Sequence, residues 1–193
     1  MIRKSLLLAA ALLAGACSRP VPKTFEYKAG MSDALIAFGV APPSNRLTVN
    51  IAAIDPAACR LTNFGGFGDK SYSFNEWAGP ATQTRYVVGK FEPGTYVISF
   101  LSRGSGVTNL ILSLERGSMA FKVNAGDFIY LGDLALAGQQ PTHVGFNPAK
   151  LRAHLAQYPG LTRPPTDYQP IRTHFAKVGA GQAGTPVAGC GLS

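Results

Sequence analysis

The chain has 193 residues and a formal net charge of +8 at pH 7, and only 15% of its residues are charged. Its 22 glycines and 14 prolines interrupt helices, so the composition argues against a helical bundle and favours a turn-rich β protein. The length is sufficient for one domain with a sizeable hydrophobic core.

The N-terminal stretch has the pattern of a secretory signal peptide. Two basic residues precede an apolar run that ends in small residues before Cys17. The run is shorter than the roughly 20 residues that span a bilayer, so we expect an export signal over residues 1–16. Leu13-Ala-Gly-Ala-Cys17 resembles the lipobox of bacterial lipoproteins, in which the cysteine thiol is acylated and becomes the first residue of the mature chain. A soluble export signal cut near Ala16 is the alternative.

The lipobox resemblance also implies a location. Proteins of that family are held at the cell envelope by acyl chains such as palmitate, and an Asp after the cysteine often retains them in the inner membrane. Ser18 occupies that position here, which favours the outer membrane with the domain facing the periplasm. Residues 17–24 are expected to form the lipidated N-terminus and a tether that its prolines keep extended.

The positive charge does not indicate nucleic-acid binding here, because an exported protein rarely meets nucleic acid. We therefore expect either a solvated surface or a contact with an anionic glycolipid, phospholipid or cell-wall polymer. Membrane association is expected through the N-terminal lipid.

Two cysteines remain if the first is acylated. Disulfides persist in exported proteins, so Cys59 and Cys190 are expected to form one bridge. The bridge would close most of the domain into a loop and contribute about 5 kcal/mol in the chain-entropy model. Two unpaired thiols are the alternative.

Apolar runs predict strands in the first half of the mature chain. Ala34–Val40 is short, apolar and flanked by helix-breaking residues, which favours a strand over a helical turn. Arg46–Ala53 alternates apolar and polar residues, as in a half-buried strand. Cys59–Thr62 is a further short candidate.

A long aromatic loop is expected between residues 63 and 84. Its glycines punctuate the segment, and a loop of this length is uncommon unless it has a function of its own. Aromatic residues dominate binding hot spots, so the loop is a candidate partner-binding site, and a lid over the core is the alternative. The candidate residues are Phe64, Phe67, Tyr72, Phe74 and Trp77.

The next segment has the strongest pattern of a β-hairpin. Arg85–Leu101 holds two apolar strands around Glu92-Pro-Gly-Thr95, in which Pro and Gly suit a type II turn. Three further strands are expected at Asn109–Leu114, Met119–Val123 and Phe128–Leu134. A turn at Asn124–Asp127 is expected before the last of them. Strands at this spacing predict an all-β fold, an antiparallel β-sandwich over residues 25–136.

Two phrases within these strands carry a resemblance. Phe91-Glu-Pro-Gly-Thr-Tyr96 and Phe121-Lys-Val-Asn-Ala-Gly-Asp-Phe-Ile-Tyr-Leu-Gly132 resemble segments of transthyretin-like or carboxypeptidase-regulatory-like domains found in bacterial lipoproteins. The resemblance implies a sandwich fold, and it implies a binding or structural module in place of an enzyme.

The composition changes after residue 136, and residues 137–193 are expected to form a short helical extension and a Gly-rich tail. Asn147-Pro148 is a cap followed by proline at the first helical position, and Leu151, Leu155 and Tyr158 share one face. A second helical turn or two is expected between Thr166 and Ala176, with Ile171 and Phe175 facing inward.

No motif for a cofactor, a metal or catalysis stands in a convincing context. The G-x-G-x-x-G of residues 179–184 lies in a polar tail and lacks the strand and helix of a dinucleotide site. The three histidines, His143, His154 and His174, lack the spacing of metal ligands.

A basic segment near the end of the chain is either a solvated helix face or a contact for anionic head groups. It contains Lys150, Arg152, Arg163, Arg172 and Lys177, opposed by Asp167. The sequence thus predicts a lipid-anchored, non-catalytic binding or structural module of the envelope, and the alternative is an envelope hydrolase with an unrecognised active site.

Overall fold

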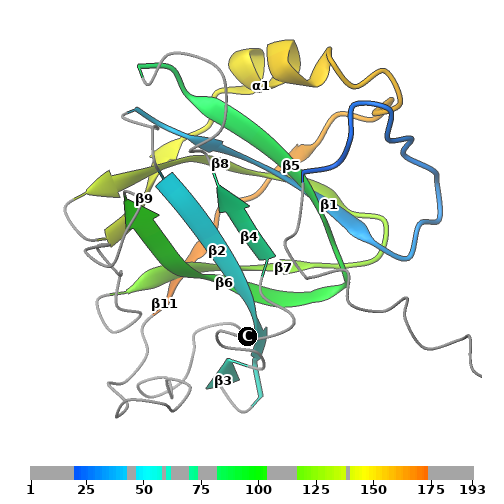
Figure 1. The fold of residues 1–193 in the computed structure, drawn as a ribbon. Coiled ribbons are helices and arrows are strands. Elements are labelled where there is room, and N and C mark those ends of the chain that lie inside the picture. The colour runs from blue at the N-terminus through cyan, green and yellow to red at the C-terminus, as the bar shows by residue number, and fades with distance from the viewer. Residues whose placement is uncertain are drawn as a thin grey trace, which may run out of the picture.

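A computed structural model describes residues 20–42, 47–57, 60–61, 70–73, 82–103, 117–137 and 140–173. These residues form strands and one short helix, which confirms the expected all-β class (Figure 1). The strands are β1 (Ala34–Val40), β2 (Leu47–Asp55), β3 (Arg60–Leu61), β4 (Lys70–Ser73), β5 (Arg85–Phe91), β6 (Gly94–Arg103), β7 (Ser118–Val123), β8 (Phe128–Ala137), β9 (Gln140–Gly145), β10 (Thr166–Asp167) and β11 (Ile171–Thr173), and the helix is α1 (Pro148–Leu155). This helix is too short to cross a bilayer.

The strands belong to two sheets. One sheet has the order β10-β8-β1-β5, with β9 also paired to β8, and the other has the order β11-β7-β6-β2-β3, with β4 also paired to β2. The pairs β1–β8 and β8–β10 are parallel, so the first sheet is mixed and differs there from the expected antiparallel arrangement. Parallel neighbours need long connections, and the strands of both pairs lie far apart in the chain. The other described pairs are antiparallel, as expected.

The predicted hairpin at residues 85–101 is also wrong. Both strands form, but β5 pairs with β1 in one sheet and β6 pairs with β2 and β7 in the other. Gly94 is not among the described glycines with positive φ, so the connection is not the expected type II turn. Apolar side chains of both strands, including Phe91 and Ile98, pack in one cluster between the sheets, and this non-local packing overrides the local turn signal.

The turn at residues 124–127 forms as predicted. Gly126 has φ 74°, and the N–H of Asp127 donates to the Asn124 carbonyl oxygen at 3.1 Å. The turn connects β7 to β8, so it too leads from one sheet into the other. The expected loop over residues 63–84 is likewise interrupted, because β4 pairs with β2 inside it.

One hydrophobic cluster draws side chains from both sheets. It includes Ile36 and Phe38 of β1, Ile98 of β6 and Phe121 of β7, all at most 1% exposed. The Phe121 ring stacks on Tyr96 at a centroid distance of 5.8 Å and meets Phe91 edge-on at 6.3 Å. Such aromatic pairs add to the free energy gained by burying their area.

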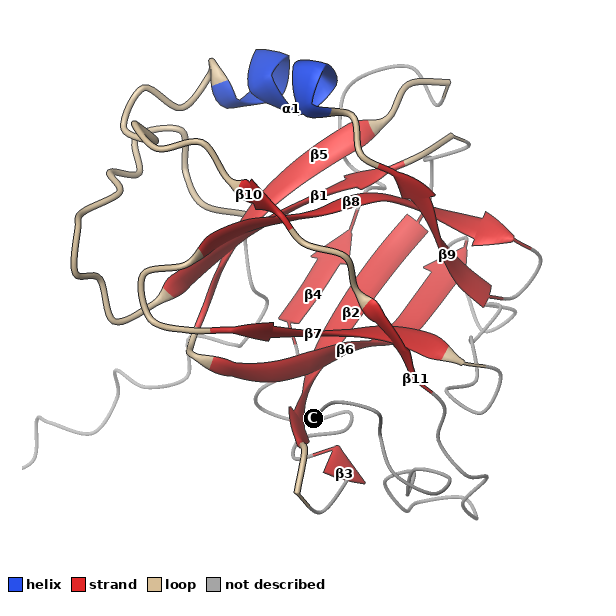
Figure 2. Cartoon of the chain, turned by 180° about the vertical axis from the view of Figure 1, so that it is seen from behind, coloured by secondary structure: helices blue, strands red, loops and turns tan. Residues whose placement is uncertain are grey.

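A second cluster covers the opposite face of the first sheet. Alternate residues of β1 contribute to it, among them Leu35 and Ala37, because successive side chains on a strand point to opposite faces. Leu151 of α1 and Tyr158 pack there, so all seven residues of β1 are buried. Figure 2 shows α1 lying across this sheet.

Helix α1 begins as the sequence predicts. The side chain of Asn147 accepts a hydrogen bond from the N–H of Lys150 at 3.2 Å, and Pro148 occupies the first turn. Leu151 and Tyr158 are buried and Leu155 is half-buried, as expected for the inward face.

Over residues 166–173, the described part of the expected range, the second helical segment does not form. Residues 166–167 are β10 and residues 171–173 are β11, which pair with β8 and β7 respectively. Pro170 disfavours helical backbone at the residue before it, and Pro164 and Pro165 restrict the approach. Ile171 is 38% exposed and Phe175 lies outside the described residues, so the expected inward face is wrong for Ile171. The segment after residue 137 therefore forms more than a helical extension, because β9 and β10 join the first sheet and β11 joins the second.

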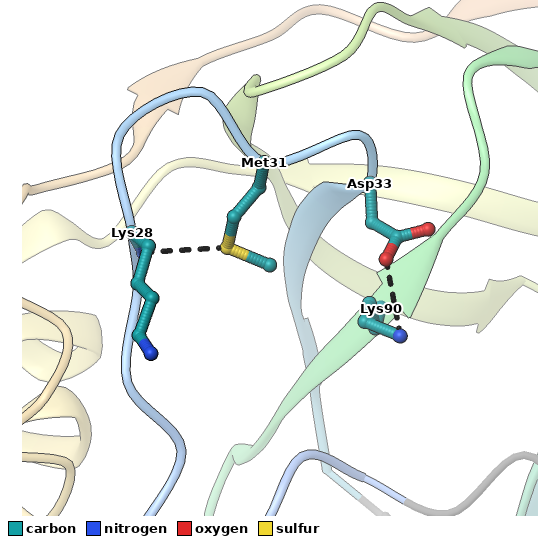
Figure 3. A network of polar contacts seen from close by, with 4 residues as sticks. All are labelled: Lys28, Met31, Asp33 and Lys90. Atoms are coloured by element: carbon teal, nitrogen blue, oxygen red, sulfur yellow. Dashed lines mark hydrogen bonds and ion pairs between the residues drawn. The ribbon is translucent and has the colours of Figure 1, made fainter.

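The loop that leads into β1 is held by local contacts (Figure 3). Gly30 turns the chain with φ 80°, and the Lys28 N–H lies 3.4 Å from the Met31 sulfur. The Lys90 ammonium forms an ion pair with Asp33 at 3.1 Å. An ion pair near the surface contributes about 0–1 kcal/mol, so this pair adds little to the stability of the fold.

Candidate functional site

Described residues already pack on the first sheet four positions after the expected anchor Cys17. Val21 is 7% exposed and packs in the cluster that contains Leu151 and Tyr158. Its N–H donates to the Val88 carbonyl oxygen at 2.9 Å, on the edge of β5. Residues 20–24 therefore lie partly on the sheet and are not a free tether over the whole expected range.

The residues after Val21 run beside α1 and the turn that follows it. The N–H of Tyr27 donates to the Gly160 carbonyl oxygen at 3.0 Å. A Cβ atom at residue 160 would lie 2.9 Å from Glu26 Cα, which shows how closely the two backbones approach. Lys23 lies near enough to His154 to affect its pKa. The N-terminal segment and α1 thus share one face of the protein.

A groove of about 470 Å³ opens between α1 and residues 158–167. Its walls include the apolar side chains of Leu151, Leu155 and Leu161, together with several prolines. Arg152 and Arg163 also line it, and both are exposed. The volume lies within the range of small-molecule sites, and the chemistry suits a ligand that is partly apolar and carries negative charge.

A buried polar cluster lies in the first sheet, on β5 and β8. Asp133 of β8 is 7% exposed and accepts hydrogen bonds from the Tyr130 hydroxyl at 2.6 Å and from the Tyr86 hydroxyl at 3.3 Å. The Tyr130 oxygen in turn accepts the N–H of Asn147, at the start of α1, at 3.2 Å. Burial and the Asp133 charge raise the pKa of Tyr86 to about 12, and burial with the Asp133 hydrogen bond raises the pKa of Tyr130 further. Both phenols are therefore hydrogen-bond donors at neutral pH.

Two histidines flank this cluster. His154 of α1 lies against Tyr86 and Tyr158, at centroid distances of 5.8 and 5.4 Å. His143 of β9 packs on Phe146 at 4.8 Å. Among the described residues, the buried Nε2 atom of each ring has no hydrogen-bond partner. The described part of the chain shows no group of acidic, histidine and cysteine side chains arranged for a metal ion.

Because these histidines are partly buried, we expect the protein to lose stability in mild acid. Burial lowers the pKa of both side chains; Lys23 lowers that of His154 further, and Asp133 partly opposes the effect at His143. The pKa of each histidine in the folded state lies below its value of about 6.5 in the unfolded state. The stability that comes from keeping these histidines neutral is therefore fully present above about pH 6.5, and it is lost as the pH falls toward the folded-state pKa values. Urea unfolding at a series of pH values should show this decrease.

The matched variant for that measurement is His154→Gln, which retains a polar side chain without the titration. We expect its free energy of unfolding to depend less on pH between about 6.5 and the lower folded-state pKa than that of the wild type. An unchanged slope in the variant would mean that His154 does not titrate differently on unfolding.

The structure distributes the predicted site residues unevenly. Tyr72 lies in β4 opposite Val49, and Arg172 lies on β11, whereas Lys150 and Arg152 are on α1. Arg163 lines the groove and Asp167 is on β10, while His143 is on β9 and His154 on α1. The other predicted residues fall outside the described residues: Cys17, Cys59, Cys190, Phe64, Phe67, Phe74, Trp77, His174 and Lys177.

Sequence reasoning missed Asp133 with its two tyrosines and the groove beside α1. A carboxylate inside the apolar run of β8 was the available signal for the first, because a buried charge requires partners. For the groove the available signal was the basic segment with Arg152 and Arg163, but the sequence did not show that these two residues line one groove. Comparisons with protein-family models, curated proteins and solved structures find no match to this chain.

Proposed function

We propose that this protein is an exported lipoprotein, acylated on Cys17, whose domain acts as a non-catalytic binding or structural module of the cell envelope. The observation that carries the proposal is the export-signal pattern that ends in Leu13-Ala-Gly-Ala-Cys17. Three residues separate Cys17 from Val21, which is buried and hydrogen-bonded to β5. An acyl anchor at Cys17 would therefore hold the folded domain close to the membrane surface.

The proposed fold is a β-sandwich related to the transthyretin-like or carboxypeptidase-regulatory-like domains. In support, side chains from both sheets join one hydrophobic cluster, as the inner faces of a sandwich do. The parallel pairs β1–β8 and β8–β10 make the first sheet mixed, so the arrangement would differ from a purely antiparallel sandwich.

The proposed location is the outer membrane, with the domain facing the periplasm, because Ser18 replaces the Asp that favours retention in the inner membrane. Two-chain acylation is sufficient for stable membrane attachment, unlike a single myristoyl chain. An envelope protein or an anionic glycolipid is the proposed partner, and the aromatic segment from Phe64 to Trp77 stays a predicted contact for it.

The anchor is tested by replacing Cys17 with alanine in the producing cells. We expect the wild type to incorporate a fatty-acid analogue and to fractionate with membranes, and Cys17→Ala to lose both properties, because the thiol that carries the lipid is gone. Labelling and membrane fractionation measure the two effects.

The double variant Cys59→Ala, Cys190→Ala is the matched control, since it removes thiols without removing the lipobox cysteine. It should remain labelled and membrane-bound. An unlabelled, soluble wild type would refute the anchor and indicate a free exported domain.

A further inference from the structure

We propose that the groove between α1 and residues 158–167 binds an anionic phospholipid of the bilayer that holds the Cys17 anchor. The location of the ligand rests on the proposed function, but the site itself is argued from the described residues. Three features support this ligand: the short distance along the chain from Cys17 to Val21, the apolar lining of the groove and the charge at its edge.

The reach of the chain brings the anchor to this side of the protein. A peptide spans at most about 3.3–3.6 Å per residue, so Cys17 lies within about 14 Å of Val21. Val21 packs in the same cluster as Leu151 and Tyr158, both of which line the groove. A lipid on Cys17 would therefore enter the bilayer near α1, and the groove would face lipid head groups at high local concentration.

The groove offers surfaces for both parts of a phospholipid. The half-buried Leu155 and Leu161 provide an apolar lining for the upper part of an acyl chain, with the buried Leu151 beneath them, and a volume of about 470 Å³ suits a fragment of that size. The groove is open on one side. The part of the acyl chains that does not fit in it would therefore stay in the bilayer.

The charge at the groove favours a phosphate. Arg152 and Arg163 are exposed, and within the described residues neither forms an ion pair. Arg163 has only a long contact of 3.5 Å to the Tyr27 hydroxyl, so its guanidinium is available. A guanidinium group matches two phosphate oxygens at once, which a lysine ammonium cannot do. Lys23 and Lys150 are exposed on the same side of the protein and strengthen the attraction to a negatively charged surface.

One carboxylate, Asp167, also lines the groove, and it offsets part of the positive charge. The remaining charge suits one phosphodiester better than a polyanion. The acyl chains on Cys17 are the competing occupant, but they carry no phosphate that the two arginines could neutralise. Charge complementarity therefore favours a phospholipid over the protein's own lipid.

The first experiment uses the full mature chain with Cys17→Ala, so that binding is measured without the anchor. Vesicles of phosphatidylcholine with and without phosphatidylglycerol are sedimented with the protein. We expect binding to require phosphatidylglycerol. The variant Arg152→Gln, Arg163→Gln should bind about 30-fold more weakly, because each basic residue near the surface contributes to the attraction.

The matched control is Lys122→Gln, Arg172→Gln, which removes the same charge from β7 and β11; neither residue lines the groove. It should bind within a few-fold of the parent protein. Equal losses in the two double variants would show a general charge effect and overturn the site. Thermal melting of each variant checks that the fold is retained.

A second measurement distinguishes the groove from the surface, and the phospholipid from the protein's own acyl chain. Dihexanoyl-phosphatidylglycerol, kept monomeric, should bind the Cys17→Ala protein by calorimetry and should not bind the variant Arg152→Gln, Arg163→Gln. Vesicle binding without monomer binding would overturn the groove as the site. Monomer binding that disappears in the acylated wild type would assign the groove to the protein's own lipid and overturn the proposed occupant.

The outcome does not depend on whether Cys17 is acylated in cells. Failure of the labelling experiment with success of the lipid titration would remove the anchor and leave the groove as a lipid site. The reverse result would leave an anchored domain with no lipid bound beside α1.

Discussion

Phe121→Ala is expected to lower the free energy of unfolding by about 3–5 kcal/mol. The ring is 1% exposed, stacks on Tyr96 and meets Phe91 edge-on, so its removal leaves a cavity and breaks two aromatic contacts. Phe121 lies on β7 of one sheet and Phe91 on β5 of the other, and the cavity would therefore open between strands of different sheets. Urea unfolding of the purified domain measures the change.

Val144→Ala is the matched control for this experiment. Val144 is also an apolar residue on a strand, but it is 61% exposed, so its truncation should change stability by less than about 0.5 kcal/mol. Similar losses in the two variants would contradict the shared cluster between the sheets, and with it the proposed sandwich.

Gly39→Ala is expected to destabilise the protein by about 1–3 kcal/mol or more, as overpacking of a core does. A Cβ atom at residue 39 would collide with the Asp133 carboxylate, and it would lie 2.9 Å from both Thr84 Cγ2 and Tyr86 Cε1. The carboxylate cannot move away easily, because the hydroxyls of Tyr86 and Tyr130 hold it. Thermal or urea unfolding measures the loss.

Gly94→Ala controls for the general effect of replacing a glycine. Neither glycine has a positive φ, but the nearest side-chain atom to a Cβ at residue 94 is 3.6 Å away, an ordinary contact. Because alanine also reduces the entropy of the unfolded chain, this variant should be neutral or slightly stabilised. If Gly39→Ala were equally neutral, the close approach of β1 to Asp133 would be wrong.

The buried cluster around Asp133 connects the core to the proposed lipid site. The Tyr130 hydroxyl donates to Asp133 and accepts the N–H of Asn147, the capping residue of α1. The start of the helix is thereby fixed to β8, while Leu151 fixes its middle through the outer cluster. The helix wall of the groove, which carries Arg152, is thus attached to the core at two points, and a binding site benefits from such support.

The local features of this protein could be predicted from its sequence. The cap Asn147 with Pro148 determined where α1 begins, because these residues satisfy or remove the first N–H groups of the helix. The turn with Gly126 and the strand β1 also followed from a few consecutive residues. In each case the signal and the structure lie within one short stretch of chain.

Only the tertiary structure decided which strands pair and what lies beside α1. The segment expected to form a hairpin at residues 85–101 connects two sheets, because β5 pairs with β1 whereas β6 pairs with β2 and β7. Arg152 and Arg163 meet at the groove, and Val21 approaches it, only because the chain folds back over one face of the sheet. Pairing and burial between distant residues depend on the whole packed arrangement, which no local pattern of residues encodes.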